Sequence, residues 1–177
     1  MKRLQFLLLI AVLSSPSFAT EYRSDYSGQQ NREIKSLSID DIQQIQAGKG
    51  WGLAKAAELN GYPGPRHVLD MAEELGLTSD QQETVKTLFE LMQTQAVVVG
   101  ERYLKIERQI DLAFNNKNID SNSLKKLIDN SAEALAELRY VHLEKHLAVI
   151  RQLSQHQVVT YNKLRGYDSG DAQHKQH

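Results

Sequence analysis

The sequence predicts an all-α protein built on a long antiparallel helical hairpin, and three observations support this fold class. The chain of 177 residues has only 3 Pro and 10 Gly, and 7% of its residues are aromatic. Long stretches rich in Leu, Ala, Glu, Gln and Lys favour helix over sheet. Apolar residues also recur at alternating steps of four and three through the middle of the chain, as in packed helices. We therefore expect one domain, with the hairpin at its centre and short flanking helices.

The predicted hairpin covers residues 77–157. Its first helix carries an apolar seam, formed by Val85, Phe89, Met92, Ala96, Val99, Tyr103, Ile106, Ile110 and Ala113. The polar run 115–118 ends this helix, and Asp120 is placed to cap the next one, with Ser123 three residues further on. Because the turn is short, the two helices must be antiparallel neighbours.

The second long helix carries two apolar stripes. One consists of Leu124, Leu127, Ile128, Ala134, Leu135, Leu138, Val141, Ala148 and Val149, and the other of Tyr140, Leu143, Leu147 and Ile150. A helix with two apolar stripes needs two partners. One partner is the first long helix, and the other is either the short N-terminal helices or a second copy of the chain, so we expect a homodimer if those helices leave the second stripe bare.

The same local signal stands at both ends of the hairpin. The stretch 77–81 reads Leu-Thr-Ser-Asp-Gln, in which Thr78 can cap a helix while Gln81 reaches back to the N–H group of the cap. The stretch 153–157 reads Leu-Ser-Gln-His-Gln and repeats this arrangement with Ser154 and Gln157. Each copy predicts a capping box at the start of a helix.

Short helices are predicted on both sides of the hairpin. Ser38 starts the first, which Gly48 ends, and residues 53–59 form a second of about two turns. A third runs from Pro65 to residue 75, because Pro suits a first helical turn. Residues 158–164 form a last helix. The apolar side chains of these segments are expected to pack on the hairpin.

The two termini differ in composition from the helical domain, which we place at residues 38–167. Residues 1–19 combine Lys2 and Arg3 with a short apolar run and small residues before a cleavage site, as in a secretory signal peptide. Residues 20–37 form a polar, flexible leader, and residues 168–177 a polar, disordered tail. An exported helical chain without Cys fits the periplasm, and no membrane span is expected.

Charge and motif content exclude two classes of function. The chain has 21 Lys and Arg against 22 Asp and Glu, and loss of the signal peptide leaves 19 against 22, a balance unsuited to nucleic acid. The acidic residues are scattered at helical spacing beside basic ones, as Glu101 is beside Lys105. No phosphate loop, nucleophile elbow or zinc-protease motif is present, so we expect no enzyme and no required cofactor.

One group of residues suggests metal chemistry. His142 and His146 stand four apart on a helix, so both imidazoles can reach one divalent ion such as Zn²⁺. With the turn centred near residue 118, antiparallel pairing predicts Glu90 as a third ligand. His67, from the short helix before residue 77, is the candidate for a fourth. In the alternative interpretation, His142 is hydrogen-bonded in the core and His146 is partly exposed. His174 and His177 in the tail are further, weaker candidates.

These features together resemble the Spy/CpxP superfamily of periplasmic stress proteins, over roughly residues 50–167. The motif residues that carry the resemblance are Leu77, Thr78 and Gln81 in the first copy and Leu153, Ser154 and Gln157 in the second, where Ser replaces Thr. The stretches 51–65 and 138–146 resemble a subgroup in which metal sensing has been suspected.

The resemblance implies binding of unfolded or misfolded envelope proteins without ATP, or inhibition of an envelope-stress sensor. As the alternative, it implies a zinc-, nickel- or cobalt-responsive sensor or buffer. The chaperone branch of the superfamily also implies a basic concave cradle formed by a dimer, whereas this mature chain is slightly acidic.

Overall fold

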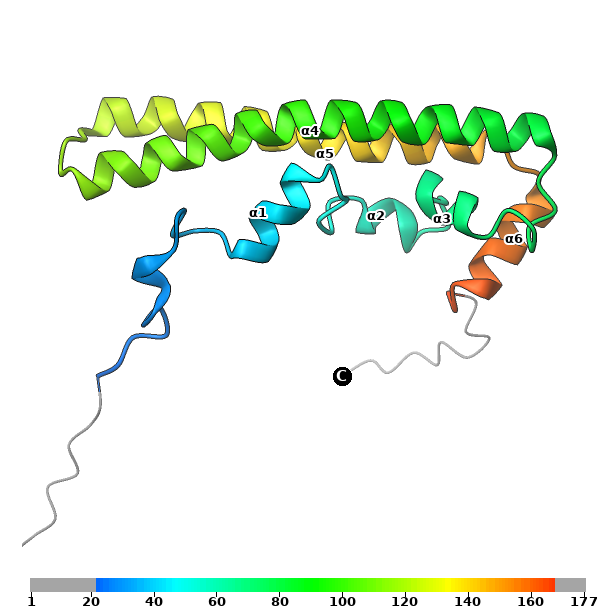
Figure 1. Ribbon diagram of the computed structural model, residues 1–177, viewed down its shortest axis with the longest axis horizontal. Coiled ribbons are helices and arrows are strands. Elements are labelled where there is room, and N and C mark those ends of the chain that lie inside the picture. Colours follow the sequence, from blue (N-terminus) through cyan, green and yellow to red (C-terminus); the bar gives the residue numbers. More distant parts are fainter. Residues whose placement is uncertain (1–21, 168–177) are drawn as a thin grey trace, which may run out of the picture. The chain divides into compact units, whose positions relative to one another are not determined.

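The computed structural model describes residues 22–167, and the regular secondary structure of these residues is entirely helical (Figure 1). The predicted all-α class is therefore confirmed. The predicted signal peptide and C-terminal tail, with His174 and His177, fall outside the described residues. Residues 22–30 belong to a separate unit made of turns, and a 3-10 helix spans Gln29–Asn31. No helix in the described range is both long and apolar enough to cross a membrane.

The second unit begins at Asn31 and is built on two long helices, α4 (Ser79–Asn115) and α5 (Ser121–Ile150). They lie side by side, joined by the short turn 116–120 (Figure 1). The α4 residues that are buried are Val85, Met92, Ala96, Val99, Gly100, Tyr103 and Leu104. The buried residues of α5 are Ser131, Ala134, Leu138, Val141, His142, Lys145, His146 and Val149. These sets follow the predicted seams in part. Val85, Met92, Ala96, Val99 and Tyr103 of α4 and Ala134, Leu138, Val141 and Val149 of α5 are buried as predicted, whereas Ile128 of the predicted α5 seam is 48% exposed.

The short helices follow one another along one side of the α4/α5 pair. They are α1 (Ile39–Gln46), α2 (Lys55–Glu58) and α3 (Pro65–Asp70), and α6 (Gln155–Leu164) follows α5 (Figure 1). Helix α1 approaches α4 very closely, since a Cβ atom on Gly100 would lie 2.7 Å from Cγ2 of Ile45. Both α2 and α3 are shorter than predicted, because turns rather than helix cover residues 53–54 and 71–76.

Two apolar clusters hold this unit together. The larger lies between α1, α4 and α5 and consists of Ile34, Leu37, Ile42, Ile45, Met92, Ala96, Val99, Tyr103, Leu104, Ala134, Leu138 and Val141. The smaller lies where α3, α4, α5 and α6 meet and consists of Val68, Leu75, Leu77, Val85, Val149 and Tyr161. The short segments are therefore part of the core.

The larger cluster corrects the predicted start of the packed domain. Residues 20–37 were predicted to be a flexible leader, yet Ile34 and Leu37 are buried against α1 and the long helices. Lys35 also forms an ion pair with Asp111 at 2.9 Å. Two apolar residues three apart are too short a pattern to predict a packed segment, so the sequence did not reveal this contact.

All four predicted N-caps are formed. Ser38, Thr78 and Ser154 each accept a hydrogen bond from the backbone N–H three residues on, and each of their boxes is closed by a returning side chain. Asp120 accepts from the N–H groups of Asn122 and Ser123. Caps depend on local sequence, so a single sequence suffices to locate them.

The two boxes of the repeated motif are joined to each other. The side-chain amides of Gln81 and Gln157 form a reciprocal pair, in which each Nε2 donates to the other Oε1 at 3.0 Å. The Gln81 amide also donates to the carbonyl of Gln152 at 2.7 Å. The motif therefore ties the start of α4 to the start of α6, in addition to capping both helices.

The second apolar stripe of α5 is covered only in part by the described residues. Tyr140 is 66% exposed and Leu147 is 46% exposed, while Leu143 and Ile150 are half-buried. The rest of the chain thus leaves Tyr140 and Leu147 available to another partner.

Candidate binding pocket

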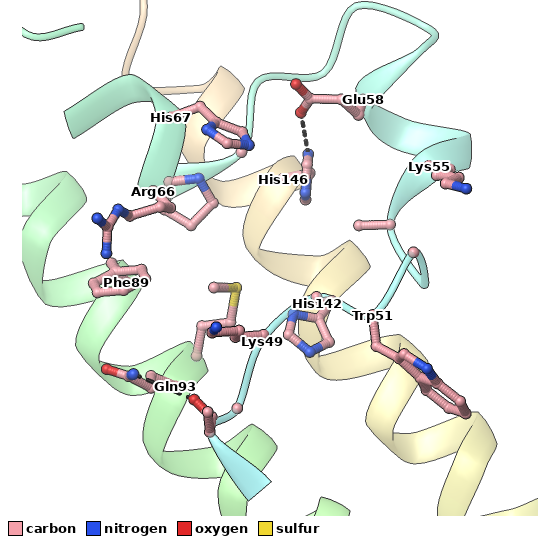
Figure 2. Close-up of a pocket in the computed structure, with 18 residues that line it drawn as sticks. Lys49, Trp51, Lys55, Glu58, Arg66, His67, Phe89, Gln93, His142 and His146 are labelled. Atoms are coloured by element: carbon pink, nitrogen blue, oxygen red, sulfur yellow. Dashed lines mark hydrogen bonds and ion pairs between the residues drawn. The ribbon is translucent and has the colours of Figure 1, made fainter. Parts of the chain in front are cut away.

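A pocket of about 540 Å³ lies between the long helices and the segment 47–67. Its walls come from three parts of the chain, which are α4, α5 and this segment (Figure 2). The residues that line it are Ala47, Gly48, Lys49, Gly50, Trp51, Gly52, Ala54, Lys55, Glu58, Gly64, Pro65, Arg66, His67, Phe89, Met92, Gln93, His142 and His146. It thus brings His67, His142 and His146 to one place.

His146 is held in one tautomer by the backbone. Its Nδ1 lies 2.6 Å from the carbonyl oxygen of Tyr62, and because a carbonyl only accepts, the proton must be on Nδ1. In the neutral ring this tautomer has its lone pair on Nε2, which is the arrangement that metal-bound histidines usually have. Gly64 leaves room for the ring, since a Cβ atom there would lie 2.9 Å from Cε1 of His146.

His142 is buried and uncharged. Only 2% of the residue is exposed, and burial, with a smaller contribution from the nearby His146, lowers its pKa to about 4. Its Nε2 is buried and has no hydrogen-bond partner among the described residues. An unpaired buried polar atom is costly, so this imidazole gains from any partner that reaches it.

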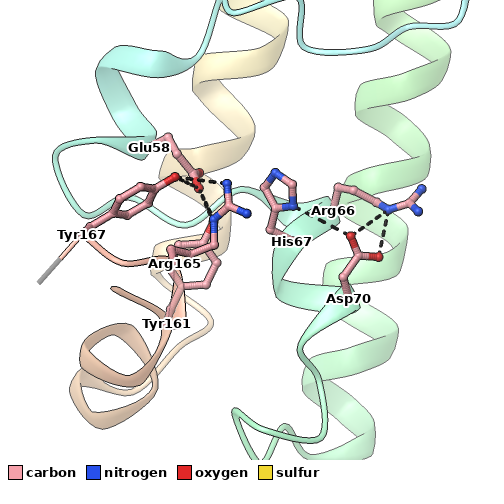
Figure 3. Close-up of polar contacts among 7 residues, drawn as sticks. All are labelled: Glu58, Arg66, His67, Asp70, Tyr161, Arg165 and Tyr167. Atoms are coloured by element: carbon pink, nitrogen blue, oxygen red, sulfur yellow. Dashed lines mark hydrogen bonds and ion pairs between the residues drawn. The ribbon is translucent and has the colours of Figure 1, made fainter. Parts of the chain in front are cut away.

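Glu58 of α2 joins the pocket to α6 (Figure 3). Its Oε1 accepts hydrogen bonds from the hydroxyl of Tyr161 at 2.6 Å, the hydroxyl of Tyr167 at 3.0 Å and Nε of Arg165 at 3.2 Å. Its Oε2 lies 3.9 Å from Nδ1 of His146. This carboxylate is therefore already compensated by groups of the C-terminal helix and the residues after it.

Other charges at the pocket also have partners. Arg66 pairs with Asp70 at 2.9 Å, and its guanidinium lies over the ring of Phe89 at 5.8 Å. Nδ1 of His67 lies 3.8 Å from the same Asp70 (Figure 3). Asp70 thus lies beside both basic side chains at this edge of the pocket.

The predicted metal ligands are brought together only in part. His142, His146 and His67 line the same pocket, but Glu90 is exposed and does not line it. Among residues 22–167, no three His, Asp or Glu side chains are arranged to hold a metal ion. The prediction of Glu90 as a third ligand is therefore wrong. The carboxylate near His146 is Glu58, which sequence reasoning missed because nothing local indicates that α2 folds over α5.

The alternative interpretation of the histidines is also corrected. It placed His142 in a core hydrogen bond and left His146 partly exposed. The structure buries both residues and gives the hydrogen bond to His146, through the carbonyl of Tyr62. Helical spacing indicated that the two imidazoles share a face, but the carbonyl belongs to a loop far away in the sequence.

Comparison of the chain with protein-family models, curated proteins and solved structures gave no match. The assignment of function therefore rests on the motif residues and on the geometry described above. The joined capping boxes, the partly exposed second stripe of α5 and the histidine-lined pocket are the three features on which it rests.

Proposed function

We propose that this chain is a periplasmic stress-response protein of the Spy/CpxP type, which binds unfolded or misfolded envelope proteins without ATP. The observation that carries the proposal is the repeated motif, whose two capping boxes meet through Gln81 and Gln157. A chance pair of caps has no reason to meet in space. The predicted signal peptide supports export to the periplasm.

Exposed apolar side chains supply a surface for unfolded clients. On α4, Leu91 is 50% exposed, Val98 67% and Leu112 55%. Positions seven apart lie nearly on one line along a helix, so these three residues form a row. We call it the α4 row. Because exposed Lys105 interrupts it, the row offers separate apolar anchors rather than a continuous seam, which suits an extended chain of variable sequence.

A homodimer through the second apolar stripe of α5 is part of the same proposal. Tyr140, Leu143, Leu147 and Ile150 follow at steps of three and four, which is the ridge that packs against another helix. A second copy of the chain would present the same ridge, as a two-fold interface requires. In this arrangement α5 joins the two copies and the α4 row contacts the client.

The experiment that tests the proposal follows the aggregation of a chemically denatured protein without ATP. The wild-type protein should slow aggregation, and Leu91→Ser/Val98→Ser should weaken this protection. Gln95→Ser, also an exposed position of α4, is the matched control and should protect like the wild type. Absence of protection at a several-fold molar excess of the wild-type protein would contradict the proposal.

Light scattering tests the dimer separately. The wild-type protein should have the mass of two chains at micromolar concentration. Tyr140→Ser/Leu147→Ser should shift the mass to one chain, because it removes the exposed part of the ridge, whereas Leu91→Ser/Val98→Ser should leave the mass unchanged. A single-chain mass for the wild-type protein would remove the dimer from the proposal without affecting client binding.

A second candidate function, sensing or buffering of a divalent metal such as Zn²⁺, is favoured by the state of the two histidines. The lone pair of His146 on Nε2 is fixed by the carbonyl of Tyr62, and His142 is neutral at pH 7. Neutral imidazole is the form that binds metal. His67 is the remaining imidazole of the pocket.

Thermal unfolding with and without Zn²⁺ tests this candidate, because a ligand bound only by the folded state raises the midpoint. His142→Ala and His146→Ala should abolish the shift. Glu90→Gln should keep it, since Glu90 lies outside the pocket. An equal shift in wild type and His146→Ala would place the metal elsewhere.

A further inference from the structure

We propose that the pocket between the long helices and the segment 47–67 is a binding site for a small organic anion with an apolar body, such as a medium-chain carboxylate. This goes beyond client binding and metal binding, because neither uses the apolar walls of the pocket or the lysines at its edge. The volume of about 540 Å³ falls within the range of small-molecule sites.

The walls of the pocket suit an apolar body. Met92 and Pro65 are buried beside it, and Phe89 packs against the larger core cluster. Ala47 and Ala54 leave space on the side of the segment because their side chains are short. Transfer of aliphatic groups from water onto such walls is the main source of affinity at small-molecule sites.

The charges of the pocket suit a negatively charged head group. Glu58 is compensated by Arg165, and Arg66 is compensated by Asp70. Lys49 and Lys55 line the pocket but form no ion pair with any described residue. The ammonium of Lys55 folds back over its own segment, since a Cβ atom on Gly52 would lie 3.8 Å from Nζ. The uncompensated charge of the pocket is thus positive.

A buried polar atom without a partner also indicates a ligand. Nε2 of His142 has no hydrogen-bond partner in the described part of the chain, although the residue is 2% exposed and its ring lines the pocket (Figure 2). A core that needs no ligand would normally satisfy such an atom. An oxygen of a bound carboxylate or hydroxyl group can supply the missing partner after a small movement of the ring.

The chain carries its own reporter for the test. Trp51 is its only tryptophan and lines the pocket, and its indole N–H donates to Asp41 at 2.7 Å. We expect decanoate, added below its micellar concentration, to change the tryptophan fluorescence of the purified protein in a saturable way. Decyltrimethylammonium, which has an alkyl chain only one carbon longer and the opposite charge, should bind about fivefold more weakly. Calorimetry on the same samples gives affinities that do not depend on the fluorescence.

Three variants connect this binding to the pocket. Lys49→Gln/Lys55→Gln should weaken decanoate binding about fivefold, because it removes two exposed charged groups that can contact the carboxylate. Lys126→Gln removes an exposed lysine of α5 away from the pocket and should leave the affinity unchanged. Ala54→Leu should weaken decanoate and the cation alike, because the larger side chain fills the cavity.

The outcomes are separable. Circular dichroism confirms that each variant is folded, which is expected because both lysines are exposed. Equal affinity for decanoate and the cation, or equal loss in Lys126→Gln and in the double variant, would overturn the proposal. So would the absence of saturable binding in calorimetry.

Discussion

The two ends of the α4/α5 pair are built differently. Where α4 begins and α5 ends, α3 packs against both helices, and Tyr161 of α6 joins buried Val85 and Val149 in the smaller core cluster. At the turn 116–120, Leu112, Phe114 and Ile128 are exposed, and Asp120 makes only local hydrogen bonds. Local caps exist at both ends, but only the first end adds an apolar cluster shared with two further helices. Near the turn, the tertiary contacts are polar ones from the segment before α1, such as the ion pair of Lys35 with Asp111. We call the end with α3 and α6 the pocket end, and the end with residues 116–120 the turn end. Local opening is expected to cost more free energy at the pocket end, so the turn end should open first.

The largest expected effect compares two identical truncations. Leu75 is 5% exposed at the pocket end, and Leu112 is 55% exposed near the turn. Leu75→Ala should lower the free energy of unfolding by about 3 to 4 kcal/mol, because it leaves a cavity. Leu112→Ala should change it by less than about 0.5 kcal/mol, since its side chain is mostly in water already. Urea unfolding of both variants measures the difference, and similar losses would contradict the proposed division.

Acidification should affect the two ends in different pH ranges, starting with the pocket end. The pKa of His142 is about 4 in the folded protein and about 6.5 in the unfolded chain. Between these two pH values the unfolded chain binds a proton at this residue, whereas the folded protein does not. The free energy of unfolding should thus fall by up to about 3 kcal/mol between pH 6.5 and 4. Urea unfolding across this range should show that His142→Gln removes the fall. His156→Gln, at an exposed position of α6, should retain it.

At the turn end the acid response comes lower. The pKa of Asp120 is lowered from 3.8 by hydrogen bonds to its carboxylate. The backbone N–H of Ser123 has the largest effect, followed by the hydroxyl of Ser123 and the backbone N–H of Asn122. A carboxylate with a lowered pKa contributes its stability above that usual value and loses it as the pH falls through the folded pKa. The protection factor of amides near Asn122, which is the exchange rate corrected for its intrinsic pH dependence, should therefore fall only below the pH range in which His142 acts. A loss of protection already at about pH 5 would contradict the cap described here.

The joined capping boxes should show energetic coupling that an isolated cap lacks. Gln81→Ala and Gln157→Ala should each cost about 1 kcal/mol, since each loses a cap bond and a link to the other box. The double variant should lose less than the sum of the singles, with a coupling of about 0.5 to 1 kcal/mol. The control cycle pairs Gln81→Ala with Asp120→Ala, which shares no contact with it and should be additive. Additivity in both cycles would show that the boxes act independently.

What the sequence predicted well is local. Ser38, Thr78, Asp120 and Ser154 were identified as caps because a cap needs only a side chain and a backbone N–H two or three residues away. The apolar seams of the long helices were found for a similar reason, because helical periodicity repeats many times in a long segment. Both signals come from residues that are close together in the sequence, so they can be read without knowing the tertiary structure.

What the sequence did not predict depends on distant segments. The hydrogen-bond partners of Glu58 lie more than one hundred residues away in the sequence. Ile34 and Leu37 are buried by residues of the long helices, which are also far from them in the sequence. The prediction of Glu90 as a ligand was wrong because the assumed pairing of α4 and α5 considered only its position along the helix axis. It did not determine the direction in which the side chain points around that axis. Each residue turns a helix by about 100°, so residues at one height can point away from each other.

The smallest expected effect compares two residues with positive φ angles, one before α4 and one after it. Gly76 and Lys117 have φ angles of +59° and +52°, a left-handed conformation that favours glycine. Lys117→Gly should stabilise the protein by about 0.5 kcal/mol, because relief of backbone strain slightly exceeds the entropy that glycine adds to the unfolded chain. Gly76→Ala should destabilise it by about 1 kcal/mol, purely through the backbone, since no atom lies within 4 Å of an added Cβ. Urea midpoints of the two variants should therefore move in opposite directions, and a lower midpoint for Lys117→Gly would mean that the turn end depends on the lysine side chain itself.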